Sequence, residues 1–229
     1  GGYHGAKLGR YQELIENGIG PNIQTLIGEL QNKRNPSDWN LDQLGVINML
    51  NTKYFIATKQ AEGVIQNPAA LGNAWFVNNI IEVKNADEEI LKTSTTNTAN
   101  IAIYDARYSD YFSDFEINDS AKGNIELTEY TPDRLVYKST SDGDRFAVFS
   151  EVFYEGGWQA YLDGEKVDHI RVNYVLRGMK IPSGEHEIVF EFTPEHWQTA
   201  WIVSGASTAL IALFVLYSLF LAWKRMKED

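Results

Sequence analysis

Apolar residues recur at helical spacing over roughly the first fifty positions of the chain. Asn17-Gly18 is typical of a helix stop, and Gly20-Pro21 is typical of a new helix start. The second helix predicted in this way has an apolar face made of Ile23, Leu26, Ile27 and Leu30. A third helix, capped by Ser37 or Asp38, would carry Leu41, Leu44, Ile47 and Leu50. We therefore expect a helical lead-in over residues 1–51.

The spacing of apolar residues along the chain changes after residue 51. "KYFIAT" reads as a strand, and "AWFVNNIIEV" has the aromatic and β-branched content of one or two more. "NADEEILKT" predicts a short helix with Asn85 as its cap. We interpret residues 52–98 as a small α/β unit, and the polar run "TSTTNTAN" at 93–100 as a linker.

Short strands dominate the next part of the chain, residues 99–195. "DRFAVFSEVFY" is apolar on both faces, as expected of a central strand covered on both sides. Asp163-Gly164 predicts a tight hairpin, and Pro182-Ser183-Gly184 predicts another turn. At least six strands at this spacing indicate an antiparallel β-sandwich. The predicted fold class is thus α+β.

An uncharged stretch near the C-terminus predicts a membrane span. As a helix, residues 199–223 would extend about 37 Å, which is enough to cross a hydrocarbon core of about 30 Å. Trp197, Trp201 and Trp223 lie near its ends, where aromatic rings favour the interface. We expect a transmembrane helix over 196–223 and a basic tail over 224–229. The positive-inside rule then places the tail in the cytoplasm and residues 1–195 outside it.

Composition narrows the possible partners. The formal net charge is −11, so the chain is a poor ligand for nucleic acid, and its main partner should be the lipid bilayer. The chain has no cysteine, which excludes disulfides and thiolate chemistry. It begins "GGYHGAKLGR", without an initiating Met, and reads as the C-terminal piece of a longer protein.

The stretch "EVFYEGGWQAYLDGEKV" has two interpretations. Trp158 and Ala160 alternate with Gln159 and Tyr161, as in a strand with one buried face. Alternatively, the aromatic rings could form a platform for a sugar. In that case the candidate contacts are Tyr154, Trp158 and Tyr161.

Several stretches, in order along the chain, resemble the bacterial YfhO-type membrane proteins. They are "GYHGAKLGRYQELIENG", "LGVINMLNTKYFI", "ALGNAWFV", "FSEVFYEGGWQAYLDGEKV", "RVNYVLRGMKIPSGEHEIVFEFTP" and the final span with its basic tail. The resemblance implies a multi-pass protein of the bacterial cell (inner) membrane, similar to transferases that take a sugar from a polyprenyl-phosphate carrier to a surface glycan or lipid. This chain would supply the last extracytoplasmic region and the last helix.

The resemblance assigns no catalytic residue to this chain, because the acidic residue of that class lies on an early loop. The preceding membrane helices of the same protein would be partners. We expect acceptor binding or support from this part; the alternative is a non-catalytic anchored glycan-binding or scaffold module. Following a missing membrane helix, Lys7, Arg10 and Tyr11 could meet a lipid phosphate, or Lys7 and Arg10 could snorkel at the membrane surface.

A second polar group could line a loop of the sandwich or simply form a solvated strand edge: Arg171, Asn173, Tyr174 and Arg177. The candidate glycan contacts among them are Arg171, Asn173 and Arg177. No catalytic constellation is visible in the sequence. The four histidines are far apart and no H-E-x-x-H pair occurs, so we expect no zinc site and no cofactor. Asp114, Glu116 and Asn118 alternate like calcium ligands, but position six of such a loop would be Asp119 rather than Gly. A strand with an acidic face is the preferred interpretation there.

Overall fold

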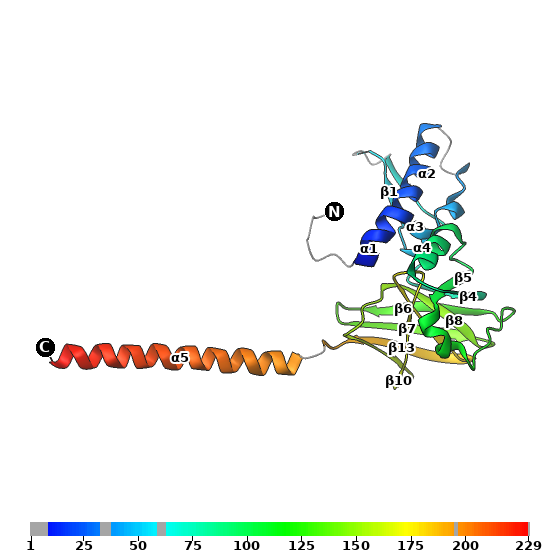
Figure 1. Ribbon diagram of the computed structural model, residues 1–229. Coiled ribbons are helices and arrows are strands. Elements are labelled where there is room, and N and C mark those ends of the chain that lie inside the picture. Colours follow the sequence, from blue (N-terminus) through cyan, green and yellow to red (C-terminus); the bar gives the residue numbers. More distant parts are fainter. Residues whose placement is uncertain (1–8, 33–37, 59–62, 195–196, 229) are drawn as a thin grey trace.

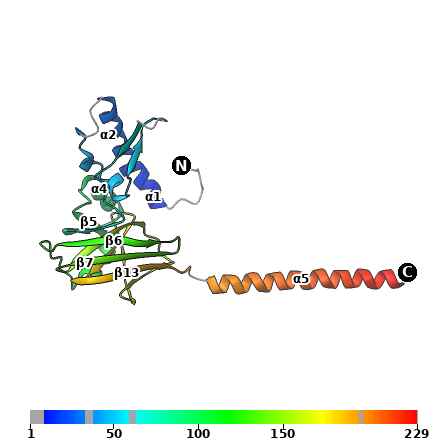
Figure 2. The ribbon, with the colours of Figure 1, turned by 180° about the vertical axis from the view of Figure 1, so that it is seen from behind.

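The computed structural model describes residues 9–32, 38–58, 63–194 and 197–228. It has three parts: a helical lead-in, a β-rich body below it, and a long C-terminal helix that extends away from the body (Figure 1). The reverse view shows the same arrangement, with the lead-in stacked on one side of the sheets (Figure 2). These parts fit the α+β class predicted from the sequence.

The lead-in helix does not stop at Asn17-Gly18, so this prediction was wrong. Helix α1 (Gly9–Leu14) passes through a π-helical turn (Ile15–Ile19) directly into α2 (Gly20–Gln31). Pro21 cannot donate to the carbonyl four residues back and its ring crowds that carbonyl, and a widened π turn accommodates both effects. Gly18 is buried in close contact, because a Cβ there would lie 3.0 Å from a methyl of Val46.

The prediction of one third helix carrying Leu41 to Leu50 was wrong, because two short elements take its place. Of its two proposed caps, Ser37 lies outside the described residues and Asp38 is not the N-cap of either element. A 3₁₀ turn (Leu41–Gln43) precedes the short helix α3 (Gly45–Met49). A hairpin follows, in which β1 (Tyr54–Ile56) pairs with β2 (Val64–Gln66). The buried residues shared by these elements form a small core: Leu26, Trp39, Leu41, Leu44, Ile47 and Phe55.

A βαβ unit joins the lead-in to the sandwich. Strands β4 (Asn79–Val83) and β5 (Ile101–Asp105) pair in parallel through the crossover helix α4 (Ala86–Thr95). The predicted cap is confirmed, because Asn85 Oδ1 accepts the Glu88 N–H at 3.0 Å. The polar run is not a free linker. Thr98 within it is buried, donating to Gly45 O and accepting from the Trp75 indole at 3.0 Å.

Two antiparallel sheets form the predicted sandwich. The five-stranded sheet has the order β10-β9-β13-β7-β6. Its strands, in chain order, are β6 (Gly123–Tyr130), β7 (Arg134–Ser141), β9 (Trp158–Leu162), β10 (Glu165–Val167) and β13 (Gly184–Phe192). The four-stranded sheet has the order β11-β12-β8-β3. Its strands are β3 (Ala74–Val77), β8 (Arg145–Val152), β11 (Ile170–Val172) and β12 (Leu176–Ile181).

The core between the sheets is aromatic. Tyr137, Phe149 and Phe190 are fully buried and meet edge to face. The ring centroid of Phe149 lies 4.9 Å from that of Tyr137 and 4.9 Å from that of Phe190. Strand β8 is buried over most of its length, as its two apolar faces predicted. Strand β3, which precedes the polar run, pairs with β8, so the four-stranded sheet includes residues from both sides of that run.

The turns of the sandwich follow the predicted chemistry. Asp163 and Gly164 have φ of 52° and 84°, the left-handed values of a two-residue hairpin between β9 and β10. The segment around Phe115 and Ile117 is irregular rather than a strand, so that prediction was wrong. Its alternation still has a physical basis, because these two side chains pack on the core while Asp114, Glu116 and Asn118 are exposed.

Helix α5 (Trp197–Glu228) carries the predicted membrane span. The helix is long and apolar enough to cross a membrane, and within its most apolar window no residue is buried against the rest of the chain. It continues through the basic residues Lys224, Arg225 and Lys227, so helical structure does not end where the apolar stretch ends.

Candidate functional site at the anchored end

One end of the sandwich carries the connection to α5, and we call it the anchored end. It contains the last residue of β13, Phe192, which is paired with the first residue of β9, Trp158. The segment that follows β8 also reaches it, since the ring of Tyr154 lies 6.5 Å from that of Phe192. The lead-in begins beside this end, because Arg10 of α1 contacts the β11–β12 turn.

A pocket of about 240 Å³ opens where these elements meet. Aromatic and charged side chains share its wall. The lining residues are Gly9, Arg10, Tyr11, Val152, Phe153, Tyr154, Glu155, Arg171, Tyr174 and Val175. The pocket is thus built from α1, the segment after β8, and the β11–β12 hairpin.

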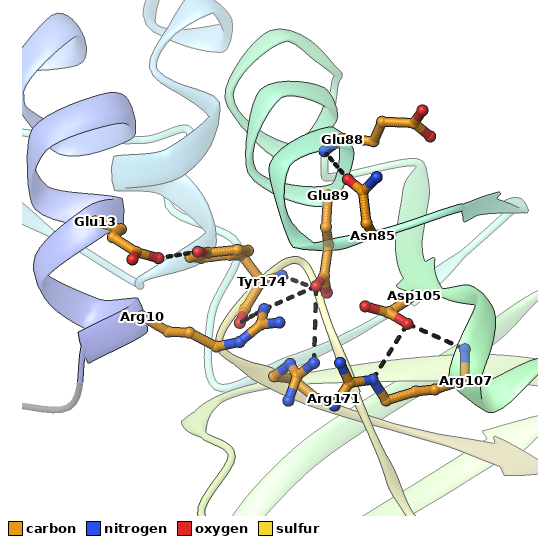
Figure 3. Close-up of polar contacts among 9 residues, drawn as sticks. All are labelled: Arg10, Glu13, Asn85, Glu88, Glu89, Asp105, Arg107, Arg171 and Tyr174. Atoms are coloured by element: carbon orange, nitrogen blue, oxygen red, sulfur yellow. Dashed lines mark hydrogen bonds and ion pairs between the residues drawn. The ribbon is translucent and has the colours of Figure 1, made fainter.

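A buried carboxylate lies beneath the pocket. Glu89 of α4 is inaccessible to solvent, and its Oε2 accepts from Arg10 Nη1 at 2.8 Å, with Arg171 Nη2 at 3.8 Å (Figure 3). Burial raises the pKa of Glu89, while the two guanidinium groups act in the opposite direction. Asp105 and Arg107 form a separate ion pair beside this group at 3.1 Å.

The turn between β11 and β12 is strained and held from three sides. Asn173 and Tyr174 both have positive φ, 48° and 71°, which is costly for an aromatic residue. The Asn173 side chain accepts the Ile103 N–H at 2.9 Å, and the Tyr174 N–H donates to Glu89 at 3.2 Å. The Tyr174 hydroxyl donates to Glu13 of α1 (Figure 3). Burial and Glu13 raise the pKa of Tyr174 to about 12, so the hydroxyl stays protonated as a donor.

The guanidinium of Arg171 is largely buried in the wall of this pocket. Its exposed fraction is 7%, yet among the described residues its Nε and Nη2 find no hydrogen-bond partner. A buried guanidinium normally satisfies these donors. These two nitrogens are themselves buried, and Nη2 faces the Glu89 carboxylate at 3.8 Å, so Arg171 contributes positive charge to the pocket wall.

A protein-family comparison connects this architecture with known proteins. The family described as bacterial membrane protein YfhO matches residues 87–204, from α4 through the sandwich to the start of α5. The chain belongs to the YfhO family. No curated protein and no solved structure matches the chain.

The residues matched by the YfhO family include most of the pocket lining. The family description names no ligand. Of the residues singled out from the sequence, five lie at the pocket: Arg10, Tyr11, Tyr154, Arg171 and Tyr174. Asn173 is buried in the turn beneath. Lys7 lies outside the described residues. The structure thus brings together residues that the sequence analysis placed in three separate groups.

The other described candidates of this YfhO chain do not line the pocket. Trp158 is half-buried and packs on the sandwich core, which supports the strand interpretation of its stretch. Arg177 is 2% exposed, with its guanidinium 4.1 Å from the Trp158 ring and its Nε and Nη2 donating to Val152 O. Tyr161, on the same strand as Trp158, is half-buried and lies outside the described pockets' linings.

Sequence reasoning missed Glu89 and Glu13. A signal for Glu89 existed, because it shares a helix face with Ala86, Ile90 and Thr93, where an acidic residue is out of place. Its partners were not predictable, since Arg10 and Arg171 are distant in sequence. Within residues 9–32, 38–58, 63–194 and 197–228, no group of three or more His, Asp or Glu side chains is placed to hold a metal ion.

We expect the buried His169 to make the stability of this YfhO domain depend on pH. Its ring lies 5.4 Å from those of Phe153 and Phe190, and burial, helped by Arg177, lowers its pKa from 6.5 to about 4. The unfolded chain therefore binds the proton more strongly, and stability should fall as pH drops from about 6.5 toward 4. We expect a loss of about 2 kcal/mol across this window. Denaturant unfolding at pH 7 and pH 5 measures it, and His169→Gln should flatten the dependence.

Proposed function

We propose that this chain is part of a larger membrane protein that transfers a sugar from a polyprenyl-phosphate carrier to a cell-surface glycan or lipid. In this proposal, residues 1–195 face away from the cytoplasm and the basic tail lies within it. The catalytic residue belongs to another part of the protein, and the pocket at the anchored end binds the acceptor.

The observation that supports this role most directly is the composition of the pocket. Tyr11 and Tyr154 offer rings on which a sugar can stack, while Arg10 and Arg171 place positive charge in the pocket wall, which favours hydroxyl or phosphate oxygens. A pocket lined by apolar and aromatic residues together with a few polar groups is typical of small-ligand sites. Arg177 and Asn173 are too deeply buried for direct contact, so in this proposal they support the fold around the site.

The test uses membranes from a strain that lacks the gene and is complemented with the intact protein. Incorporation of labelled sugar from a polyprenyl-phosphate donor is measured for the wild type and for Tyr154→Ala. Loss of one stacking contact should lower incorporation roughly fivefold to tenfold at limiting acceptor. Tyr161→Ala removes a similar ring outside the pocket and should leave incorporation unchanged.

Deletion of the gene decides between the two functions. If deletion leaves sugar incorporation intact, the transferase proposal is wrong. Glycan binding by the purified chain would then favour an anchored binding module. If Tyr161→Ala lowers incorporation and Tyr154→Ala does not, the acceptor contacts the outer sheet face instead of the pocket.

A further inference from the structure

The connection between the sandwich and the membrane helix is short. Strand β13 ends at Phe192 and α5 begins at Trp197. Five residue steps reach at most about 18 Å even when fully extended. Because α5 is the membrane-spanning helix of this family member, the anchored end must stay close to the bilayer surface.

The anchored end presents aromatic rings to its surroundings. Tyr130, at the end of β6, is 65% exposed, and Tyr154 is 47% exposed. Tyrosine favours the membrane interface, where the ring meets the acyl boundary and the hydroxyl meets water. The acidic charge at this end is partly neutralised, because Arg134 pairs with Glu129 at 2.7 Å and with Glu191 at 3.4 Å.

The β1–β2 hairpin adds exposed apolar side chains to this surface. Tyr54, Ile56 and Val64 are 58%, 76% and 48% exposed, while Phe55 between them is buried in the lead-in core. The hairpin and the start of α1 both lie on the side of the molecule where β13 ends (Figures 1 and 2). One side of the body thus carries the membrane connection, the exposed tyrosines and the β1–β2 hairpin (Figures 1 and 2).

We propose that this side rests on the bilayer, with Tyr130, Tyr154 and the outward face of the β1–β2 hairpin in the lipid interface. Lipid covers the exposed apolar surface, because this surface adjoins the membrane helix α5. The short connection between β13 and α5 holds the surface close to the bilayer. The pocket, which Tyr154 lines, then opens at the level of the lipid headgroups. This orientation does not depend on whether the protein transfers a sugar.

The absence of cysteine allows a direct test with single spin labels. Ile56→Cys and Tyr130→Cys place a label on the proposed surface, and Glu165→Cys, exposed beyond the Asp163-Gly164 turn at the opposite end, is the matched control. Each labelled chain is placed in nanodiscs of phosphatidylethanolamine and phosphatidylglycerol. Collision rates with oxygen, which concentrates in lipid, and with a water-soluble nickel chelate are measured by electron paramagnetic resonance.

Contact with lipid predicts that labels at positions 56 and 130 are mobile, accessible to oxygen and several-fold less accessible to nickel than the label at 165. Nickel access equal to that at 165 would show that the side faces water and would overturn the proposal. Immobile labels shielded from both reagents would overturn it too, since protein rather than lipid would then cover the surface. Circular dichroism and unfolding midpoints equal to those of the unlabelled chain establish that each variant is folded.

Discussion

Replacement of Arg10 by methionine is expected to lower the free energy of unfolding by about 3 kcal/mol at neutral pH. Methionine keeps much of the side-chain volume but removes the cation 2.8 Å from the buried carboxylate of Glu89. Glu89 would then retain only Arg171, at 3.8 Å, as a cationic partner. Denaturant unfolding of the intact chain in detergent, followed by tryptophan fluorescence, measures the change.

The pH dependence of that loss identifies its cause. The folded-state pKa of Glu89 is already raised, and removal of Arg10 should raise it further. A raised carboxyl pKa weakens folding as pH climbs through it, so the deficit should be full near pH 7 and small near pH 4. Arg10→Met/Glu89→Gln should recover part of the stability. An equal loss at both pH values would instead indicate lost packing.

Asn173→Ala is expected to lower the free energy of unfolding by about 3 kcal/mol, for two reasons. The Ile103 N–H would lose its acceptor in a buried position, and alanine tolerates the φ of 48° poorly. Asn173→Gly separates the two effects, because glycine accepts the backbone conformation but supplies no acceptor. The unfolding midpoint should therefore be highest for the wild type, lower for Asn173→Gly and lowest for Asn173→Ala.

A surface asparagine provides the control for these variants. Asn124→Ala, at an exposed position of β6, should change stability by no more than about 0.5 kcal/mol. If Asn173→Ala is as mild as Asn124→Ala, the turn is not held as the structure indicates. If Gly and Ala at position 173 are equally damaging, the hydrogen bond to Ile103 dominates and backbone strain contributes little.

Local rules predicted much of the fold. The Asn85 cap, the Asp163-Gly164 hairpin and the double-sided apolar strand β8 each depend on nearby residues, and each is confirmed. Predictions failed where distant packing overrides local preference. Asn17-Gly18 resembles a stop, yet Val46 packs against Gly18 and the helix continues.

The candidate site was less accessible to sequence reasoning. Arg10 and Arg171 could be chosen as basic residues beside aromatics, but nothing local indicates that they converge on Glu89. That convergence depends on how α1, α4 and the β11–β12 hairpin pack, which is a property of the tertiary fold. A residue-by-residue reading therefore identified parts of the pocket without the carboxylate beneath it.

The uninterrupted helix from Gly9 to Gln31 has a mechanical consequence. It forms a single rod of about 34 Å, with Arg10 at the pocket and Leu26 in the lead-in core. A tilt of roughly 10° about its first turn would displace the other end by about 6 Å over this length. A helix that broke at Asn17-Gly18 would absorb such a tilt at the break. Because the π-helical turn keeps the helix continuous, a tilt at the pocket would instead displace the lead-in core, which contains Phe55 of the β1–β2 hairpin.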